Sequence, residues 1–335
     1  MSIEAFKSLK HLNTFAIDVT ARYFSSVPNV ETLQQLLQEY QNPFILGGGS
    51  NILFTRDVDR LVIHSAIMGI EKIEETPEHI FLKIGAGENW HQLVLYCIDH
   101  DYAGIENLSL IPGTVGAAPI QNIGAYGVEL KEVLFGVDTL LKEPDKKHYF
   151  PQHFSNKQCQ FNYRDSVFKH KLKNNCVITH VILRLNKKPI FNIKYEEIRD
   201  KLANNELSIK AISDAVIEIR QKKLPNPNKI PNSGSFFKNP IIPEKVYNVL
   251  IKEFPTLPHF PAPDHHIKIP AAWLIEQCGF KGKRMGNVGV HVNHALVLVN
   301  YGNARGEEVL QLSQAIQSAV KKKFDITLTP EVNIY

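Results

Sequence analysis

The sequence has few cysteines, no long hydrophobic run and no strong excess of charge of either sign. None of the four cysteines (Cys97, Cys159, Cys176, Cys278) forms a C-x-x-C pair, so we expect free thiols in a reducing compartment. The apolar runs, such as 295–299, are far shorter than the roughly 20 residues of a membrane span. The N-terminal residues show no apolar signal segment. We therefore expect a cytoplasmic protein without membrane partners.

The charge balance excludes a further class of partner. The 335 residues carry a net charge of +4 from 38 Lys and Arg against 34 Asp and Glu, which is too mild and too evenly spread for nucleic-acid binding. A local cationic pocket for an anionic small molecule is compatible with it. With 44% hydrophobic and 21% charged residues, the composition is that of an ordinary globular protein, and the length suggests two domains or three small ones.

Several familiar site motifs are missing as well. No G-x-x-x-x-G-K-[ST] or G-x-S-x-G occurs, and in the nearest approach to G-x-G-x-x-G, at 85–90, Trp90 takes the place of the third glycine. The 14 histidines form no metal-ligand pattern, because His265 and His266 are adjacent and His291 and His294 have the wrong spacing for one strand face. We expect no metal.

Hydrophobic periodicity and turn residues predict alternating helices and strands. Helices are expected at 30–40, 88–99, 208–222, 243–254, 271–278 and 307–322. Strands are expected at 44–46, 52–54, 60–64, 80–84, 177–185, 295–300 and 326–335. The segment 224–243 contains five prolines and is interpreted as a long ordered loop at a domain boundary.

Two glycine-rich stretches suggest a phosphate-bearing ligand. The first is L-G-G-G-S-N at 46–51 and the second is I-P-G-T-V-G-A-A-P at 111–119. Glycines let backbone N–H groups converge on a phosphate without obstruction, and Ser50 and Asn51 can add donors. Taken singly, a tight hairpin or close packing explains each stretch equally well. Two such loops in one domain favour a large flat ligand such as a flavin dinucleotide.

Two polar stretches are ambiguous by themselves. In N-Y-R-D-S-V-F-K at 162–169, Arg164 beside Asp165 has the form of a surface ion pair. In the proline-rich segment that ends in G-S-F-F-K-N-P at 234–240, Ser235 has the form of a turn residue. Neither pattern indicates chemistry without its neighbours.

Seven motifs in a fixed order resemble one family. They are N-T-F at 13–15, G-G-G-S-N, I-P-G-T-V-G-A-A-P, N-I-G-A-Y-G at 122–127, Y-R-D-S-x-F-K, G-S-F-F-K-N-P and the terminal P-E-V. The chain resembles the UDP-N-acetylenolpyruvoylglucosamine reductases of bacterial cell-wall synthesis over its whole length. The segment A-A-W-L-I-E-Q-C-G-F-K-G at 271–282 is similar to that of the longer subtype.

The resemblance implies an α+β flavoenzyme with a vanillyl-alcohol-oxidase-type FAD-binding fold of two subdomains and a separate α+β substrate-binding domain. The implied boundaries are 1–68 joined by the C-terminal strand 328–335, then 69–222, then 223–327. NADPH would reduce bound FAD, which would deliver hydride to C3 of the enolpyruvyl group and yield UDP-N-acetylmuramate. The implied partners are the UDP-linked enolpyruvyl amino sugar and NADPH, and we expect a monomer.

The resemblance also implies residue roles. Arg164 would stabilise the carboxylate-bearing intermediate, Glu331 would be a second stabilising residue and Ser235 would protonate C2. FAD would be held by Gly47, Gly48, Gly49, Ser50, Asn51, Pro112, Gly113, Thr114, Gly116, Ala117, Asn122 and Ile123. The substrate would be positioned by Tyr195, Lys223 and Asn239. Phe260 stands where many longer-subtype members have tyrosine, so we leave it out of the site.

Two other functions remain open at this stage. An FAD-dependent oxidase of the same fold would use O₂ as acceptor, but Glu331 and the 234–240 motif argue against it. A flavin- or nucleotide-binding protein without catalysis would keep the glycine loops, but the presence of Arg164, Ser235 and Glu331 argues against that. Flavin absorbance and substrate-dependent NADPH consumption distinguish the three.

Overall fold

The computed structural model describes residues 2–144, 146, 148–203 and 206–335, which form two compact units. The first unit comprises Met1–Lys7, Thr20–Gly49 and Val58–Lys222. The second unit comprises Ser8–Val19, Ser50–Asp57 and Lys223–Tyr335. Each unit is therefore built from segments that are far apart in the sequence.

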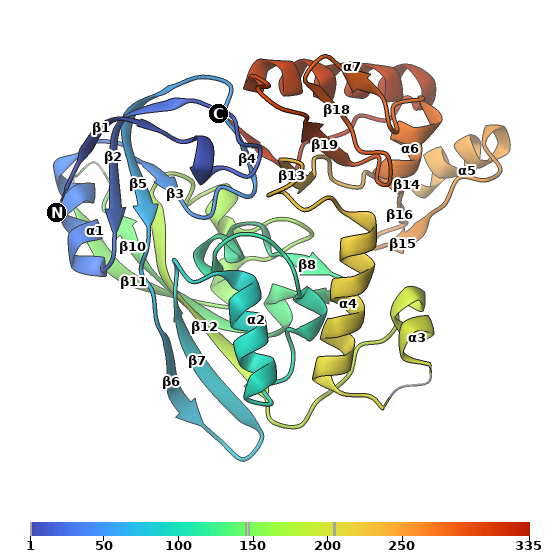
Figure 1. Ribbon diagram of the computed structural model, residues 1–335. Coiled ribbons are helices and arrows are strands. Elements are labelled where there is room, and N and C mark those ends of the chain that lie inside the picture. The colour runs from blue at the N-terminus through green and yellow to red at the C-terminus, as the bar shows by residue number, and fades with distance from the viewer. Residues whose placement is uncertain (1, 145, 147, 204–205) are drawn as a thin grey trace. The chain divides into compact units, whose positions relative to one another are not determined.

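A mostly parallel sheet begins the first unit (Figure 1). Strands β2 and β3 both run parallel to the central strand β5. The helix α1 starts where Asn29 accepts a hydrogen bond from the Thr32 N–H, and it buries Leu33 and Leu36 against the sheet. The order across the sheet is β1 (Glu4–Ser8), β2 (Thr20–Val27), β5 (Val58–Ser65) and β3 (Phe44–Leu46), and α1 spans Val30–Glu39.

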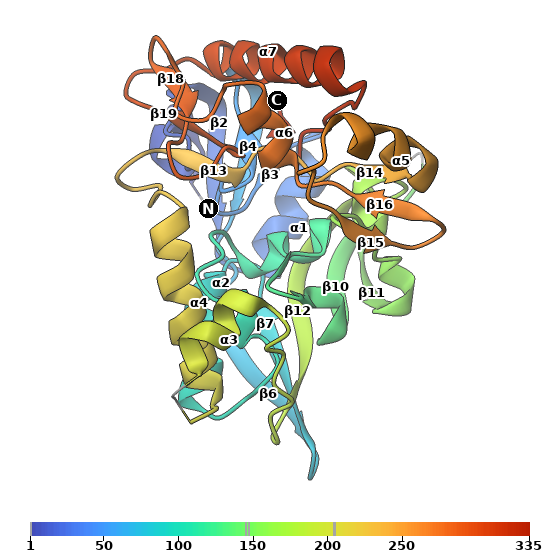
Figure 2. The ribbon, with the colours of Figure 1, turned by 90° about the vertical axis from the view of Figure 1, so that its right-hand side faces the viewer.

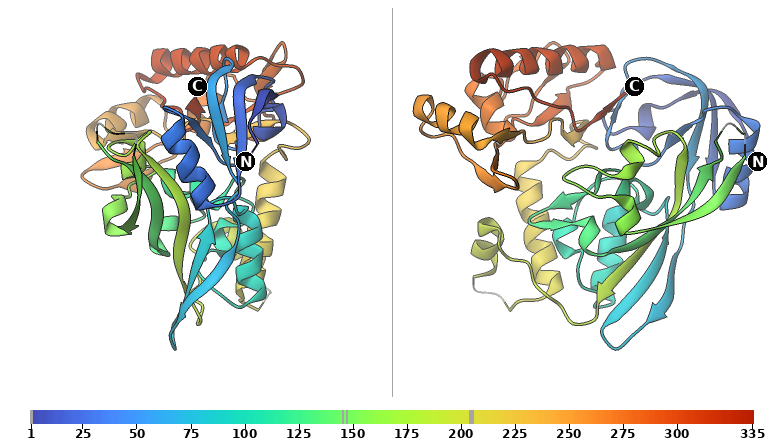
Figure 3. Two further views of the ribbon diagram at one scale, coloured as in Figure 1. Left: turned by 90° about the vertical axis from the view of Figure 1, so that its left-hand side faces the viewer. Right: turned by 180° about the vertical axis from the view of Figure 1, so that it is seen from behind.

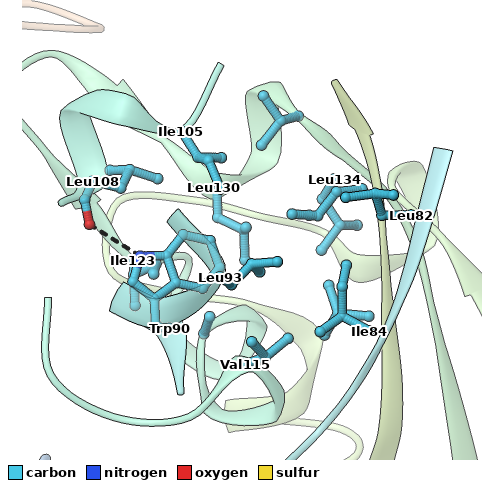
Figure 4. Packing of buried hydrophobic residues seen from close by; sticks show 14 of the residues in the cluster. Leu82, Ile84, Trp90, Leu93, Ile105, Leu108, Val115, Ile123, Leu130 and Leu134 are labelled. Atoms are coloured by element: carbon cyan, nitrogen blue, oxygen red, sulfur yellow. Dashed lines mark hydrogen bonds between the residues drawn. The ribbon is translucent and has the colours of Figure 1, made fainter. Parts of the chain in front are cut away.

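A five-stranded sheet and the helix α2 form the main core of the first unit (Figure 3). The neighbouring strands whose register is resolved all pair antiparallel. Trp90, the first residue of α2, is buried among aliphatic side chains and donates from Nε1 to the Leu108 carbonyl at 3.0 Å (Figure 4). The elements are β11 (Tyr149–Ser155), β10 (Leu134–Lys142), β12 (Cys176–Asn186), β7 (His79–Gly85), β6 (Ile70–Glu75) and α2 (Trp90–Asp99).

Two further helices and a short hairpin complete the first unit. Ile198 and Leu202 of one helix pack against Ile212 and Val216 of the other, and Tyr126 from the hairpin packs on the same cluster. These elements are α3 (Glu196–Leu202), α4 (Ile209–Lys223, ending at the unit boundary), β8 (Gly124–Ala125) and β9 (Val128–Glu129). Single 3₁₀ turns lie at Glu106–Leu108, Val115–Ala117, Pro119–Gln121, Leu130–Glu132, Lys157–Cys159 and Val167–Lys169.

The second unit contains three helices and, besides the short β4–β20 pair, two small sheets. The arrangement can be followed in Figure 2. The long helix α7 covers β18 and β19, and α5 lies against β14 and β16. One sheet consists of β13 (Asn232–Ser235), β19 (Val297–Asn300), β18 (Val288–Val290) and β17 (Arg284–Met285), and the other of β14 (Ile241–Pro243), β16 (His266–Lys268) and β15 (Phe260–Ala262). The helices are α5 (Glu244–Glu253), α6 (Ala271–Gln277) and α7 (Gly306–Phe324), with a 3₁₀ turn at Lys10–Leu12.

The C-terminal residues return to an early segment of the second unit. Strand β20 (Asn333–Ile334) pairs in parallel with β4 (Ile52–Leu53). The Asn333 N–H donates to the Asn51 carbonyl at 3.1 Å, and the Tyr335 N–H donates to the Leu53 carbonyl at 2.9 Å. The pairing places Asn51, at the end of the first glycine motif, beside the chain that carries Glu331.

The six predicted helices are confirmed, with ends that differ by at most two residues. Two other predictions are wrong in part. The segment 224–243 contains β13 and β14 rather than loop alone. Of the predicted strand 326–335, only Asn333–Ile334 is regular, and Pro330 forms an isolated bridge to Phe237. No helix within the described residues is long and apolar enough to cross a membrane.

Candidate active site

The two glycine-rich loops lie directly against each other in the first unit. A Cβ atom placed on Gly47 would lie 2.6 Å from Thr114 Oγ1, and one on Gly48 would lie 3.1 Å from the Gly113 Cα. Gly113 has φ +116° and its carbonyl accepts from the Trp90 N–H at 3.0 Å. Because no side chain fits between the loops, their backbones are free to approach a ligand closely.

The turn at 85–90 packs against the second of these loops. The Gly116 N–H donates to the Ala86 carbonyl at 2.9 Å, and a Cβ on Gly116 would lie 2.5 Å from the Ala86 Cβ. The Val115 N–H donates to the Glu88 carbonyl at 2.8 Å. The 85–90 stretch, which only partly matches a dinucleotide motif, therefore supports the loop at 112–117.

The predicted FAD residues divide between the units. Ser50 and Asn51 belong to the second unit and the others to the first. The Asn122 amide donates to Glu129 Oε2 and the Asn162 carbonyl and accepts from the Lys131 N–H, all within 3.1 Å. Ile123 is buried in the core. The side chains of Asn122 and Ile123 therefore support the loop. Only the backbone of these two residues would contact a cofactor.

These features fit FAD. The facing glycines form a cradle that a single Cβ would fill, and Gly48 is exposed at its edge. Glycine backbone without side chains lets a diphosphate approach closely. The residues that would hold the cofactor are thus those of the two loops, with Ser50 and Asn51 as additional hydrogen-bonding side chains.

Arg164 is held at the tip of a strained turn in the first unit. Asn162 and Asp165 exchange two backbone hydrogen bonds of 3.1 Å across the turn, and Arg164 has φ +53°. This conformation is costly for a residue with a Cβ and is concentrated at functional sites. Arg164 Nη2 donates to the Gly124 carbonyl at 2.6 Å. The turn and this bond together orient the guanidinium.

Two tyrosines and a second arginine lie near the same hairpin. Tyr195 immediately precedes α3, is 44% exposed, and meets the Tyr126 ring edge-on with centroids 5.2 Å apart. Arg220 interacts electrostatically with the Tyr126 hydroxyl. Burial raises the pKa of Tyr126, whereas burial and the charge of Arg164 lower the pKa of Arg220.

Sequence reasoning did not identify Arg220. In α4 it follows Ile212, Val216 and Ile219 on the buried face of the helix. The sequence did contain a signal for it: the helical period predicts an apolar residue at this position, and a charged one stands there.

Ser235 and Glu331 are brought onto neighbouring segments of the second unit. Ser235 pairs with Val297, and the next residue, Phe236, donates its N–H to the Leu296 carbonyl. On the other side the Glu331 N–H donates to the Phe236 carbonyl at 2.8 Å. Phe236 and Phe237 are 0% and 1% exposed, so the backbone beside Ser235 is anchored by two buried rings.

Asparagines tie further predicted residues into the second unit. Asn51 Nδ2 donates to the Glu331 carbonyl at 3.3 Å. Asn239 Oδ1 accepts from the Ala271 N–H at the start of α6, at 2.9 Å, which leaves its amide hydrogens available to a ligand. Lys223 ends α4 and is the first residue of the second unit.

The predicted residues therefore fall into two groups. Arg164 and Tyr195 belong to the first unit, and Ser235, Glu331, Lys223 and Asn239 belong to the second. Within the described part of the chain, no group of three His, Cys, Asp or Glu side chains is placed to hold a metal ion.

Comparison with known proteins decides what this arrangement serves. Residues 226–335 match the family model for the UDP-N-acetylenolpyruvoylglucosamine reductase C-terminal domain, and residues 23–144 match an FAD binding domain. The UDP-N-acetylenolpyruvoylglucosamine reductase of Amoebophilus asiaticus is 52% identical, with 100% of this chain and 99% of the relative covered. That of Flavobacterium johnsoniae is 46% identical over 100% of both chains. The chain belongs to this reductase family.

The fold agrees with that assignment. The crystal structure of UDP-N-acetylenolpyruvylglucosamine reductase from Thermus caldophilus matches with a TM-score of 0.71 at 24% identity, covering 100% of this chain and 99% of that one. The α+β architecture with a vanillyl-alcohol-oxidase-type FAD-binding fold is therefore confirmed.

Family membership confirms the predicted activity. The protein is an FAD-dependent oxidoreductase, a UDP-N-acetylmuramate dehydrogenase. It reduces the enolpyruvyl ether of UDP-N-acetylglucosamine to UDP-N-acetylmuramate for peptidoglycan synthesis, with NADPH as the hydride donor. The alternatives of an oxidase and of a flavin-binding protein without catalysis are set aside.

Proposed function

We propose that Arg164, Ser235 and Glu331 carry out the reduction of the enolpyruvyl group. The observation that supports this most directly is the pairing of the Phe236 carbonyl with the Glu331 N–H, which places the segments of Ser235 and Glu331 side by side. A rigid frame of this kind is what a positioned proton donor needs.

Bound FAD, once reduced by NADPH, supplies the hydride that adds to C3 of the enolpyruvyl group. That addition leaves negative charge at C2 and on the attached carboxylate. In the proposal, the fork of Arg164 stabilises this charge, because a guanidinium matches a planar carboxylate with two donors. The bond from Nη2 to the Gly124 carbonyl fixes the direction of the guanidinium.

Ser235 is proposed to deliver the proton to C2. A hydroxyl is a weak acid, so the neighbouring groups must stabilise the developing charge and restore the proton. Glu331 is proposed as the second stabilising residue, with its backbone held by Phe236 and Asn51. Adding hydride at C3 and a proton at C2 completes the reduction.

The binding residues are proposed from the same resemblance. Tyr195, Lys223 and Asn239 would contact the UDP part of the substrate, and the free amide hydrogens of Asn239 support this role. FAD would be held by Gly47, Gly48, Gly49, Ser50, Asn51, Pro112, Gly113, Thr114, Gly116, Ala117, Asn122 and Ile123.

The organisation of the chain also remains a proposal. We propose FAD-binding subdomains at 1–68, joined by 328–335, and at 69–222, with a substrate-binding domain at 223–327. The parallel pairing of β20 with β4 supports the contribution of the C-terminus. We further propose that the protein is cytoplasmic, in keeping with its four free cysteines. We also propose that it is a monomer, and light scattering during size-exclusion chromatography measures its mass.

The test separates the two half-reactions in Ser235→Ala. Flavin reduction by NADPH should keep a near-normal rate, because it needs no proton at C2. Reoxidation by the enolpyruvyl substrate should slow by about 10² to 10⁴-fold, the usual contribution of a positioned general acid. Anaerobic stopped-flow absorbance measures both rates on one sample.

Ser233→Ala is the matched control, since it removes the same atom two residues away in the same strand. Its hydroxyl lies 3.4 Å from the Ile52 carbonyl and is buried. Equal slowing of both half-reactions in Ser235→Ala, or no slowing of reoxidation, would show that Ser235 has only a structural role in β13.

A further inference from the structure

Asp165, the residue after Arg164, has a side-chain partner five residues further along the chain. His170 Nε2 lies 2.8 Å from each carboxylate oxygen of Asp165. Because a carboxylate only accepts hydrogen bonds, the ring N–H of His170 is the donor. The Asp165 side chain is 29% exposed and that of His170 is 65% exposed. The carboxylate next to Arg164 is therefore directed to His170.

The guanidinium of Arg164 is directed by other groups. Its Nη2 donates to the Gly124 carbonyl at 2.6 Å, and a Cβ placed on Gly124 would lie 3.0 Å from its Nη1. The central guanidinium carbon also lies 5.5 Å from the centroid of the Tyr163 ring. The hairpin and this ring thus orient the guanidinium, while His170 orients the adjacent carboxylate.

Glu129 is a second carboxylate close to this guanidinium, and it too has donors of its own. A Cβ on Gly124 would lie 3.0 Å from Glu129 Cγ as well as from Arg164 Nη1. Glu129 Oε2 lies 2.8 Å from Lys131 Nζ and accepts from the Asn122 amide at 3.0 Å. Two acidic side chains close to Arg164 are thus engaged by other donors.

The backbone around the Asp165 side chain is anchored without the imidazole. Ser166 Oγ donates to the Ile120 carbonyl at 2.7 Å. Val167 and Phe168 are buried in the main core, and the His170 N–H donates to the Val167 carbonyl at 3.2 Å. Removing the imidazole should therefore change the direction of the carboxylate more than the position of the turn.

A carboxylate released beside Arg164 would compete with an anionic substrate, because a guanidinium binds any carboxylate within reach through paired, charge-assisted hydrogen bonds. We propose that His170 is a positioning residue that holds the Asp165 carboxylate away from Arg164. The guanidinium then remains available to the carboxylate of the enolpyruvyl substrate. The inference rests on the proposed role of Arg164 in the reduction.

The experiment compares His170→Ala, Asp165→Asn and the double variant, each loaded with flavin. Anaerobic stopped-flow absorbance measures flavin reduction by NADPH and reoxidation by the enolpyruvyl substrate, and circular dichroism verifies the fold. In His170→Ala the released carboxylate competes for Arg164, so reoxidation should slow by roughly 10-fold, the contribution of one hydrogen bond to a charged group. Flavin reduction should keep its normal rate in all three variants, because it does not involve the substrate carboxylate.

The double variant gives the decisive result. Asp165→Asn keeps an acceptor for the His170 N–H and carries no charge, so its reoxidation should stay near the wild-type rate. The double variant also lacks the competing charge and should recover that rate, whereas a purely structural defect of His170→Ala would persist in it. His170→Gln keeps an N–H donor and should retain most of the rate. His148→Ala, which removes an exposed imidazole 3.4 Å from the Glu143 carboxylate, is the matched control.

The proposal is overturned if reoxidation in His170→Ala keeps the wild-type rate, or if the double variant is as slow as His170→Ala. Arg164→Met is measured in parallel to separate this inference from the proposed function. Slow reoxidation in Arg164→Met together with either of those results would refute the role of His170 and leave that of Arg164 standing. A normal rate in Arg164→Met would refute the role of Arg164 and this inference with it.

Discussion

The two units position their proposed functional residues by different means. In the first unit Arg164 and the FAD loops are held by turns, glycine contacts and side-chain bonds to backbone carbonyls. In the second unit Ser235 and Glu331 lie on paired backbone anchored by Phe236 and Phe237. The first arrangement lets backbone approach a large cofactor, whereas the second fixes two side chains on rigid elements.

The difference teaches where each unit is vulnerable. A loop built on glycine tolerates the loss of a single hydrogen bond but not an added Cβ, because the space is occupied. A paired strand tolerates surface changes but not the loss of a buried ring beneath it. The four predictions below test this contrast, in order of decreasing effect.

Phe236→Ala should have the largest effect on stability. Removing a fully buried ring beside Ser235 leaves a cavity, and we expect a loss of about 3–5 kcal/mol in the free energy of unfolding. Urea unfolding followed by circular dichroism measures it. Val249→Ala, at a 67% exposed position of α5, should stay within about 0.5 kcal/mol. A loss below about 1 kcal/mol in Phe236→Ala would show that the rings do not anchor the strand.

Gly48→Val should fold and lose most of its flavin. The Cβ would lie 3.1 Å from the Gly113 Cα, and the two γ-methyl groups extend further into the cradle. Flavin absorbance relative to protein absorbance after desalting measures retention, and circular dichroism verifies the fold. Gly48→Ala should retain an intermediate amount. Full flavin content in folded Gly48→Val would remove this loop from the cofactor site.

Asn107→Ala should lower stability moderately and also weaken substrate binding. The 1% exposed amide bonds two carbonyls, and leaving them unsatisfied costs about 1–3 kcal/mol. Thermal unfolding and the Kd of UDP-N-acetylglucosamine are the measurements, because the hairpin supports Tyr126 and, through it, Tyr195. Asn228→Ala, in an exposed loop, serves as the control. If stability falls while the Kd stays the same, the hairpin does not position Tyr195 for substrate binding.

The smallest predicted effect is a pH dependence of folding stability that His91 causes. Burial, and secondarily the charge of Arg220, lower the pKa of His91 below its ordinary value of 6.5. Below pH 6.5 the unfolded chain therefore takes up a proton that the folded chain excludes, so stability falls as the pH drops from about 6.5 toward the lowered pKa. His91→Gln should show a smaller decrease in Tm between pH 7.5 and 5.5 than wild type. His11→Gln, which changes an exposed histidine, is the control. If the decrease in Tm of His91→Gln equals that of wild type and of His11→Gln, the prediction is wrong.

Helix positions were largely predictable, and strand pairing was not. Apolar residues at helical spacing are a local signal, and α1, α2 and α7 follow it. Strand β13 lies within a proline-rich segment and is defined by pairing with β19, more than 60 residues away. The sequence contains no local signal for a partner at that distance.

For the site, the glycine motifs could be identified from sequence, and the roles of Arg164, Ser235 and Glu331 came from resemblance. Those roles stay predictions until the variants are measured. The asparagine bonds that support the site were not predictable. Asn107 and Asn192, or Asn51 and Glu331, are far apart in the chain, and an asparagine side chain has no preferred partner until the backbone around it is folded.

The sequence by itself determined the helices, the glycine positions and, through its motifs, the family and its chemistry, because these depend on residue type and local spacing. Only the tertiary structure decided that Gly47 and Gly48 face Gly113 and Thr114, and that Glu331 lies beside Phe236. Each of these is a contact between distant segments. Such contacts arise from how the chain folds and packs, and a motif records only the residues within one segment.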